Sequence, residues 1–204
     1  MELTKPFQPI GLSAVLLVAG CAAIQSAQDV QLGRNALRRN QPAAAIGGLR
    51  RAAELDPNYR IHYALPGSVL AYLGRAHYEA GNYSEARRVL EQALSNDKND
   101  HLARLYLGLV FAKAGDQPSG RREIDNGLKG IYDSVESVAS TPYRGLYWDP
   151  AREIRSQIQR ALTGKRELSE LITIAQWTGA RLDEEIDTAR RDELRDRYLK
   201  TSNN

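Results

Sequence analysis

The sequence predicts an all-α fold, a helical solenoid of about three helix pairs that is followed by capping helices near the C-terminus. Two observations lead to this prediction. Small and large apolar residues recur in four aligned columns, at an interval that is the same in every column. Beyond these copies, residues 171–189 carry an apolar stripe at helical spacing. Both patterns are typical of helices that bury one face against a neighbouring helix.

The four columns relate three copies of one unit. The interval from the second to the third copy is 34 residues, as from Gly74 to Gly108, and that from the first to the second is 41, as from Gly33 to Gly74. Small side chains let two antiparallel helices approach closely, and large ones fill the remaining space by interdigitation. The columns are Gly33, Gly74 and Gly108; Ala45, Ala86 and Gly120; Leu49, Leu90 and Ile124; and Ala52, Ala93 and Gly127.

These columns resemble the tetratricopeptide repeat, and the second copy is closest to the family pattern. That copy carries Leu73, Gly74, Ala76, Tyr78, Gly81, Tyr83, Ala86, Leu90, Ala93 and Leu94. The resemblance implies a right-handed solenoid over residues 26–134, with repeats at 26–59, 67–100 and 101–134. The outer copies depart from the pattern, for example at Asp29 and Arg104, as is expected of terminal repeats.

The seven residues between the first two repeats, 60–66, end in Pro66, which disfavours a helix running straight through. We expect either an extra turn that relieves the join between two helix pairs or a loop that contacts a partner.

Residues 135–200 are predicted to be a connector followed by C-terminal helices. One helix is expected over 150–163, with Asp149 as its N-cap, and another over 167–199, with a potential break at Gly179. These helices either cap the apolar edge of the array or serve in docking or oligomerisation. Residues 201–204 are expected to be disordered. The charged residues of the last helix are expected on solvated faces, namely Glu184, Glu185, and the pairs Asp187 with Arg191 and Glu193 with Arg197.

The resemblance also implies a binding surface. In tetratricopeptide arrays, the first helices of successive repeats line a concave groove that receives peptides or partner helices. The positions that carry over are rich in tyrosine and basic residues, which often anchor interfaces. The alternative is that the C-terminal helices fill the groove. The predicted partner-binding residues are Arg34, Arg38, Tyr72, Arg75, Tyr78, Tyr106 and Lys113.

The N-terminal segment predicts export and a lipid on Cys21, the only cysteine. The apolar run at residues 10–20 is shorter than the roughly 20 residues that span a membrane, and it suits the core of a signal peptide. The residues Val18-Ala19-Gly20-Cys21 resemble the lipobox of bacterial lipoproteins. This resemblance implies a signal peptide at 1–20, a lipidated Cys21 and a linker at 21–25. An uncleaved anchor helix is the alternative.

We expect no cofactor, metal or catalytic site. The three histidines are scattered without metal-ligand spacing, and no serine or glycine-rich stretch has the context of a nucleophile or a phosphate loop. The 28 basic and 25 acidic residues are mixed along the chain, which argues against a nucleic-acid partner.

The sequence therefore favours a non-enzymatic adaptor or assembly factor of the bacterial cell envelope. It would be tethered to the membrane by its lipid and would bind a protein or peptide partner. Ala22, next to the cysteine, favours the outer membrane, with the repeats facing the periplasm. Two alternatives remain. One is a cell-wall or polysaccharide-binding lipoprotein, suggested by Tyr143, Tyr147 and Trp148. The other is an enzyme with a catalytic helical tail, which would need clustered acids that the spacing does not reveal.

Overall fold

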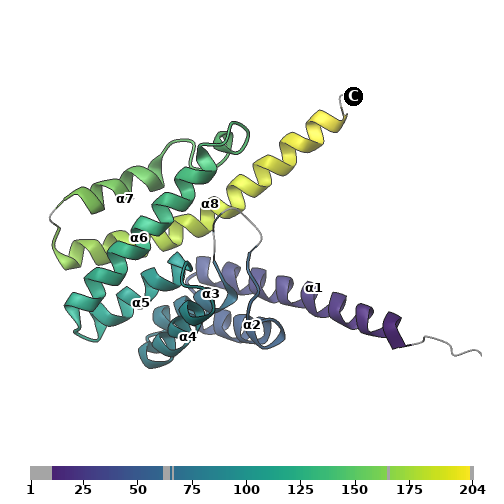
Figure 1. The fold of residues 1–204 in the computed structure, drawn as a ribbon, viewed down its shortest axis with the longest axis horizontal. Helices are drawn as coiled ribbons and strands as arrows, with labels where there is room; N and C mark the ends of the chain where they lie inside the picture. Colours follow the sequence, from purple (N-terminus) through teal and green to yellow (C-terminus); the bar gives the residue numbers. More distant parts are fainter. Residues whose placement is uncertain (1–10, 62–64, 66, 165, 203–204) are drawn as a thin grey trace, which may run out of the picture.

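The computed structural model describes residues 11–61, 65, 67–164 and 166–202, with side chains from residue 24 onward. The described chain is all-α and forms a helical solenoid, as predicted (Figure 1). Its elements are α1 (Gly11–Arg38), α2 (Pro42–Leu55), α3 (Val69–Glu79), α4 (Tyr83–Asn96), α5 (His101–Lys113), α6 (Gln117–Ala139), the 3₁₀ helix η1 (Arg144–Leu146), α7 (Glu153–Thr163) and α8 (Leu168–Ser202).

The first six helices form three stacked pairs. Helix α1 packs on α2, α3 on α4 and α5 on α6, and neighbouring pairs meet where α2 contacts α3 and α4 contacts α5. The second and third pairs are each joined by a tight turn through a glycine at positive φ, Gly81 (φ 80°) and Gly115 (φ 86°). These glycines are 34 residues apart, so the turn repeats with the columns.

The glycine column lies at the closest contact of each pair. A Cβ atom on Gly33 would lie 2.5 Å from Leu49 Cγ, and one on Gly74 would lie 2.4 Å from Leu90 Cγ. In the third pair, a Cβ atom on Gly108 would lie 2.6 Å from the backbone nitrogen of Ile124. The column of small residues thus faces the column of large residues in all three repeats, which confirms the predicted pairing of helices.

From α6 onward, some helices begin or end at other residues than predicted. Helix α6 continues past residue 134 to Ala139, and α7 begins at Glu153 instead of residue 150. Asp149 does cap α7, but from further away, because its carboxylate accepts hydrogen bonds from the backbone nitrogens of Ile154 (3.0 Å) and Arg155 (3.1 Å). A left-handed backbone at Asp149 and Arg152 turns the chain between cap and helix.

Helix α8 is continuous, and the potential break at Gly179 is not present. Gly179 instead lets α8 approach α5, because a Cβ atom there would lie 2.5 Å from the hydroxyl oxygen of Tyr106. Thr201 and Ser202, expected to be disordered, belong to the last turn of α8, where the Thr201 hydroxyl bonds the carbonyl of Arg197. Residues 203 and 204 lie outside the described residues.

The insert at 60–66 is packed against the array at both ends. Arg60 and Ser68 form an isolated antiparallel bridge, and Leu65 is buried in the core. His62, Tyr63, Ala64 and Pro66 lie outside the described residues, so the predicted partner contact of this loop stays a prediction.

The N-terminal prediction falls mostly outside the described residues. Residues 1–10 and the side chain of Cys21 are not described, whereas the backbone from Gly11 through Cys21 to Arg38 belongs to one helix, α1. Over the described part of the chain, no helix is both long enough and apolar enough to cross a membrane. The signal peptide, the linker and the lipid therefore stay predictions.

Candidate partner-binding surface

Helix α8 lies against α1, α3 and α5, the first helices of the three repeats, through contacts with Arg34, Arg75 and Tyr106. Five of the seven predicted groove residues are buried, whereas Arg38 lies at the edge and Lys113 is exposed at the end of α5. The expectation of an open groove is therefore corrected, and the alternative that the C-terminal helices fill it describes the structure. The buried residues are Arg34, Tyr72, Arg75, Tyr78 and Tyr106.

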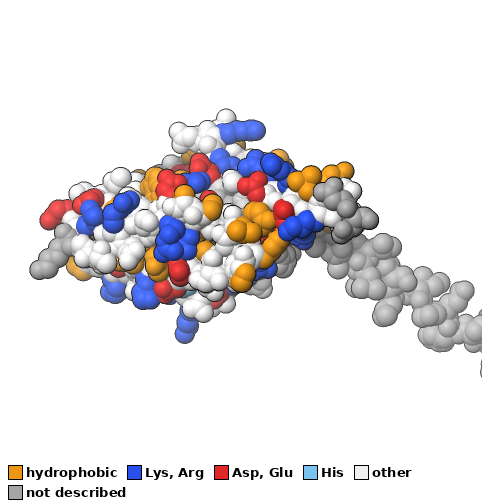
Figure 2. All heavy atoms as spheres, turned by 90° about the horizontal axis from the view of Figure 1, so that it is seen from above, with side chains coloured by type: hydrophobic (Ala, Val, Ile, Leu, Met, Phe, Trp, Pro, Cys, Tyr) orange, Lys and Arg blue, Asp and Glu red, His pale blue; other side chains and the backbone are white. Residues whose placement is uncertain are grey.

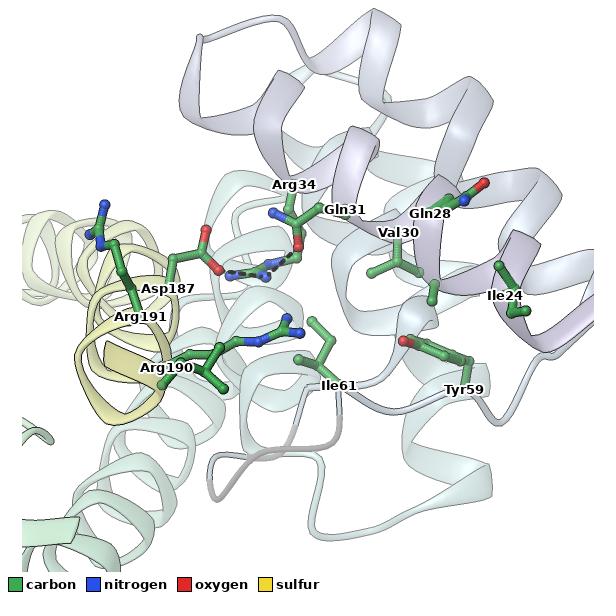
Figure 3. A pocket seen from close by; sticks show the side chains of 12 residues that line it. Ile24, Gln28, Val30, Gln31, Arg34, Tyr59, Ile61, Asp187, Arg190 and Arg191 are labelled. Atoms are coloured by element: carbon green, nitrogen blue, oxygen red, sulfur yellow. Dashed lines mark hydrogen bonds and ion pairs between the residues drawn. The ribbon is translucent and has the colours of Figure 1, made fainter. Parts of the chain in front are cut away.

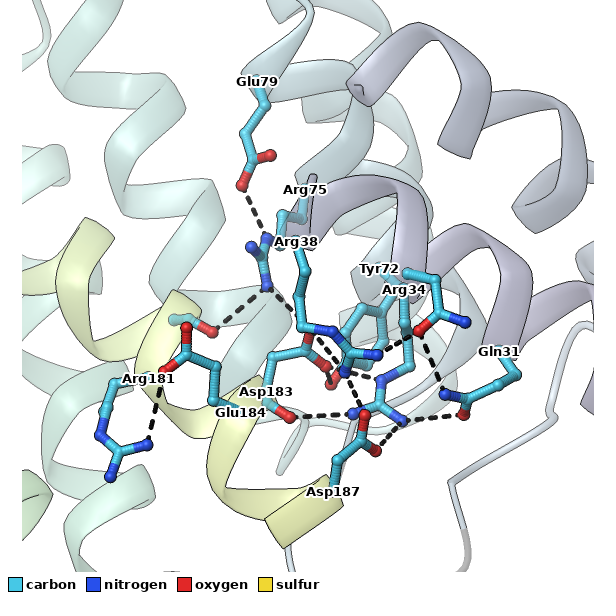
Figure 4. Close-up of polar contacts among 12 residues, drawn as sticks. Gln31, Arg34, Arg38, Tyr72, Arg75, Glu79, Arg181, Asp183, Glu184 and Asp187 are labelled. Carbon is cyan, nitrogen blue, oxygen red and sulfur yellow. Dashed lines mark hydrogen bonds and ion pairs between the residues drawn. The ribbon is translucent and has the colours of Figure 1, made fainter. Parts of the chain in front are cut away.

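The centre of this contact is a buried ion pair between α1 and α8. The Nε atom of Arg34 lies 2.6 Å from Oδ1 of Asp183, and both side chains are 1% exposed. The guanidinium also donates to the backbone carbonyl of Asp183 (3.0 Å), and the hydroxyl of Tyr72 donates to the same Oδ1 (3.2 Å) (Figure 4). We call Arg34, Arg38, Tyr72, Arg75, Asp183 and Asp187 the α8 seat.

The rest of the α8 seat lies on α1, α3 and α8 around this pair. Arg75 donates to the carbonyl of Gly179 (3.3 Å) and pairs with Glu79 (2.7 Å) on its own helix. Asp187 forms an ion pair with Arg34 (3.0 Å) and accepts a hydrogen bond from Arg38 at the edge. The seat therefore combines cationic groups of the array with carboxylates of α8, a pattern that favours one register of the helix over others.

Aromatic rings complete the seat and affect its ionisation. The guanidinium of Arg34 stacks over Tyr72 at 5.6 Å from the ring centre, and that of Arg75 over Tyr106 at 5.7 Å. Burial, with the nearby Asp183 carboxylate, raises the pKa of the Tyr72 hydroxyl, so this group stays protonated and donates. Burial alone lowers the pKa of Arg34, but the surrounding Tyr72, Asp183 and Asp187 raise it overall, so the guanidinium stays charged.

Three buried acids of α8 were missed or misplaced in the sequence analysis: Asp183, Glu185 and Glu193. Asp183 was not singled out, and Glu185, expected to be solvated, is 3% exposed and accepts from the backbone nitrogen of Asp149 (2.6 Å). Burial raises the pKa of Glu185. A signal was present, because Arg34 and Arg75 occupy one column of the repeat, and two cations on a surface that becomes buried need anionic partners.

The ion pairs that the sequence predicted on the surface of α8 also differ from those in the structure. Asp187 turns towards Arg34 and Arg38 instead of Arg191, because it forms an ion pair with the buried Arg34 and accepts a hydrogen bond from Arg38. Glu193, expected on a solvated face, is instead buried. It does lie 3.9 Å from Arg197, its expected partner, and it accepts a hydrogen bond from a tryptophan of the connector.

That tryptophan, Trp148, belongs to the core. It is 1% exposed, and its indole nitrogen donates to Glu193 Oε1 at 2.9 Å. Tyr143 and Tyr147 pack edge to face on each other, with ring centres 5.4 Å apart. An aromatic surface that binds sugars needs an accessible ring, so the structure removes Trp148 from the cluster that suggested polysaccharide binding.

The two described histidines lie within repeat helices. Burial lowers the pKa of His77 and of His101. In the part of the chain that the structure describes, no group of three or more histidine, cysteine or acidic side chains is arranged to hold a metal ion.

A pocket of about 720 Å³ is open between α1 and α8, at the end of the α8 seat (Figure 3). The Arg34–Asp187 pair forms part of its wall, and apolar side chains from α1, α8 and the start of the insert form much of the rest. Elsewhere, the face in Figure 2 mixes acidic, basic and apolar side chains. The lining residues of the pocket are Ile24, Ala27, Gln28, Val30, Gln31, Arg34, Tyr59, Ile61, Asp187, Arg190, Arg191 and Leu194.

Comparison with known proteins supports the repeat assignment. The family described as Tetratricopeptide repeat matches residues 73–134, which run from within α3 to within α6. The chain thus contains tetratricopeptide repeats, and repeats of this kind suggest a role in protein–protein interaction. No curated protein matches the sequence significantly.

Proposed function

We propose that the protein is a lipid-anchored adaptor or assembly factor of the bacterial cell envelope, non-enzymatic, which holds a protein partner at the periplasmic face of the outer membrane. The observation that carries the interaction role is the repeat array, matched over residues 73–134. The lipobox-like Val18-Ala19-Gly20-Cys21 and the following Ala22 support the anchor and its membrane.

The path of α1 supports a link between anchor and partner site. Cys21 and Ile24, the first residue that lines the pocket, are three residues apart on the same helix. At a rise of about 1.5 Å per residue, they are separated by about 5 Å along the axis. A lipid on Cys21 would therefore hold the pocket close to the membrane surface.

The partner role is tested by capture from membranes. The tagged full-length protein, crosslinked in cells and purified in detergent, is expected to retain a specific protein partner that mass spectrometry identifies. In a parallel assay, isolated cell-wall glycan is expected to retain no more of the protein than of a control lipoprotein. Retention on glycan without any crosslinked protein would instead establish the polysaccharide-binding alternative.

Replacing Cys21 by serine is expected to abolish labelling by radioactive palmitate, because the serine hydroxyl does not accept the thioether-linked lipid. The variant should leave the membrane fraction or be mislocalised, since stable anchoring requires about two acyl chains or their equivalent. An Ala22→Ser variant, which keeps the thiol, should still be labelled. Palmitate labelling that survives Cys21→Ser would exclude Cys21 as the lipid site.

A further inference from the structure

The pocket between α1 and α8 is distinct from the concave groove, because α8 forms one of its walls instead of occupying it. We propose that this pocket docks an acidic, aliphatic peptide segment of the protein partner. The inference rests on the adaptor role proposed above and specifies the chemistry of the partner. Three properties of the pocket carry it: its apolar wall, the exposed guanidinium of Arg191 and its neutral polar rim.

The apolar wall comes from three separate parts of the chain. Ile24 and Val30 belong to α1, Ile61 to the start of the insert, and Leu194 to the outer half of α8. Ile24 is 63% exposed and Leu194 is 50% exposed, so both have apolar surface left to bury. Burial releases roughly 25 cal/mol per Å² of apolar surface, which favours an aliphatic side chain in this position.

The charge of the lining that favours a particular ligand is that of Arg191. Arg34, which also lines the pocket, is already paired with Asp183 at 2.6 Å. Asp187 is already bound by Arg34 and by Arg38. Within the described part of the chain, Arg191 is exposed, donates to the hydroxyl of Thr188 (3.3 Å) and pairs with no carboxylate. The pocket is therefore complementary to a ligand that brings a carboxylate next to Arg191.

The size and rim favour a peptide. A volume of about 720 Å³ lies within the roughly 300–1,000 Å³ typical of pockets for small ligands. Gln28 on the α1 side is exposed and its carboxamide is both donor and acceptor, whereas the carboxamide of Gln31 is engaged by Arg34 and Asn35. A peptide backbone uses both capacities, whereas a lipid phosphate group only accepts. Figure 3 shows Gln31 beside the Arg34–Asp187 pair.

The test is fluorescence anisotropy with the full-length protein in detergent. The probes are two short labelled peptides of leucine, alanine and glutamate, identical except that the second has glutamine in place of every glutamate. The glutamate peptide should bind about tenfold more tightly or better, and added salt should weaken it, because the attraction is between exposed charges. Equal binding of the two peptides, or none, would overturn the proposal.

Two variants locate the site. Arg191→Glu and Leu194→Asp should each weaken the glutamate peptide about tenfold or more, with unchanged thermal melts, because both side chains are exposed. The matched control is Arg195→Glu, an exposed arginine of the same helix that lines a different pocket with Leu146 and Tyr147. The control should bind normally. Loss of binding in the control but not in Arg191→Glu would place the site elsewhere and overturn the proposal.

Two further experiments distinguish a lipid ligand from a peptide ligand and test the adaptor role separately. If vesicles of phosphatidylglycerol bind in an Arg191-dependent way and the glutamate peptide does not bind, the pocket binds lipid and the peptide proposal is overturned. Partner capture from membranes is run with Arg191→Glu as well. Capture that is unchanged in this variant overturns only the pocket assignment, whereas absence of any captured protein from the parent chain overturns the adaptor role itself.

Discussion

Replacing Asp183 by alanine is expected to destabilise the protein by about 3–5 kcal/mol, as measured by denaturant unfolding. The substitution leaves the guanidinium of Arg34, which is 1% exposed, without its closest counter-charge. Removing one partner of a buried pair is costly because the remaining charge has lost its hydration without compensation. The hydroxyl of Tyr72 loses its acceptor as well.

The adjacent residue provides the matched control. Glu184 lies one position further on the same helix, is exposed and pairs with Arg181 at 3.4 Å. Glu184→Ala should therefore change stability by about 0.5 kcal/mol or less. A double variant, Arg34→Met with Asp183→Leu, should recover most of the loss, because apolar side chains of similar size often replace a buried pair at little cost. Equal effects of Asp183→Ala and Glu184→Ala would contradict the α8 seat.

Hydrogen exchange should show where the effect of Asp183→Ala lies. The amides of α8 near Gly179 and Asp187 should exchange faster, because Arg34, Tyr72 and Arg75 hold this part of the helix. The amides of α4, which the α8 seat does not contact, should keep their protection. Uniform acceleration over the whole chain would show that α8 does not open independently of the repeats.

Replacing Gly108 by alanine is expected to destabilise the protein by about 1–3 kcal/mol or more, because overpacking forces the surrounding structure to move. The new Cβ atom would lie 2.6 Å from the backbone nitrogen of Ile124 and 2.9 Å from the carbonyl oxygen of Gly120. Backbone atoms cannot rotate away as a side chain can. The two helices of the third repeat must therefore separate, and thermal melts should show a lower midpoint.

A graded series tests this contact. Gly74→Ala meets the side chain of Leu90 instead of backbone, so it should cost less than Gly108→Ala, whereas Gly74→Leu and Ala86→Leu should each cost about 1–3 kcal/mol. The control is Gly47→Ala in α2, which is exposed and whose nearest neighbour would be 3.9 Å away. This control should stabilise by about 0.5–1 kcal/mol, because alanine is the better helix former. An unchanged melt of Gly108→Ala would show that the helices are not in close contact there.

The repeat architecture could be predicted because its information is local and periodic. Gly74 and Leu90 recur at a fixed interval as Gly108 and Ile124, and each column needs only the packing rule that a small residue admits a large one. In the structure, the glycine turn at Gly81 recurs at Gly115 with the same interval. For these reasons, the helix pairs and the all-α class were accessible from the sequence alone.

The ends of the C-terminal elements were less accessible, since they depend on contacts between distant segments. Gly179 looked like a helix breaker, but its role is to admit the hydroxyl of Tyr106 from another helix. Trp148 looked like part of an exposed aromatic cluster, but Glu193 supplies its buried hydrogen-bond acceptor. In each case the partner is too far away in sequence for spacing to reveal it.

The sequence by itself determined three repeats, the paired helices and a helical C-terminal region. Only the tertiary structure decided that α8 fills the groove and that a pocket lies beside it, between α1 and α8. The physical reason is that helical periodicity records which face is apolar, but not which charges meet on burial. Arg34 and Asp183 lie 149 residues apart, and their pairing becomes favourable only when folding removes both from water.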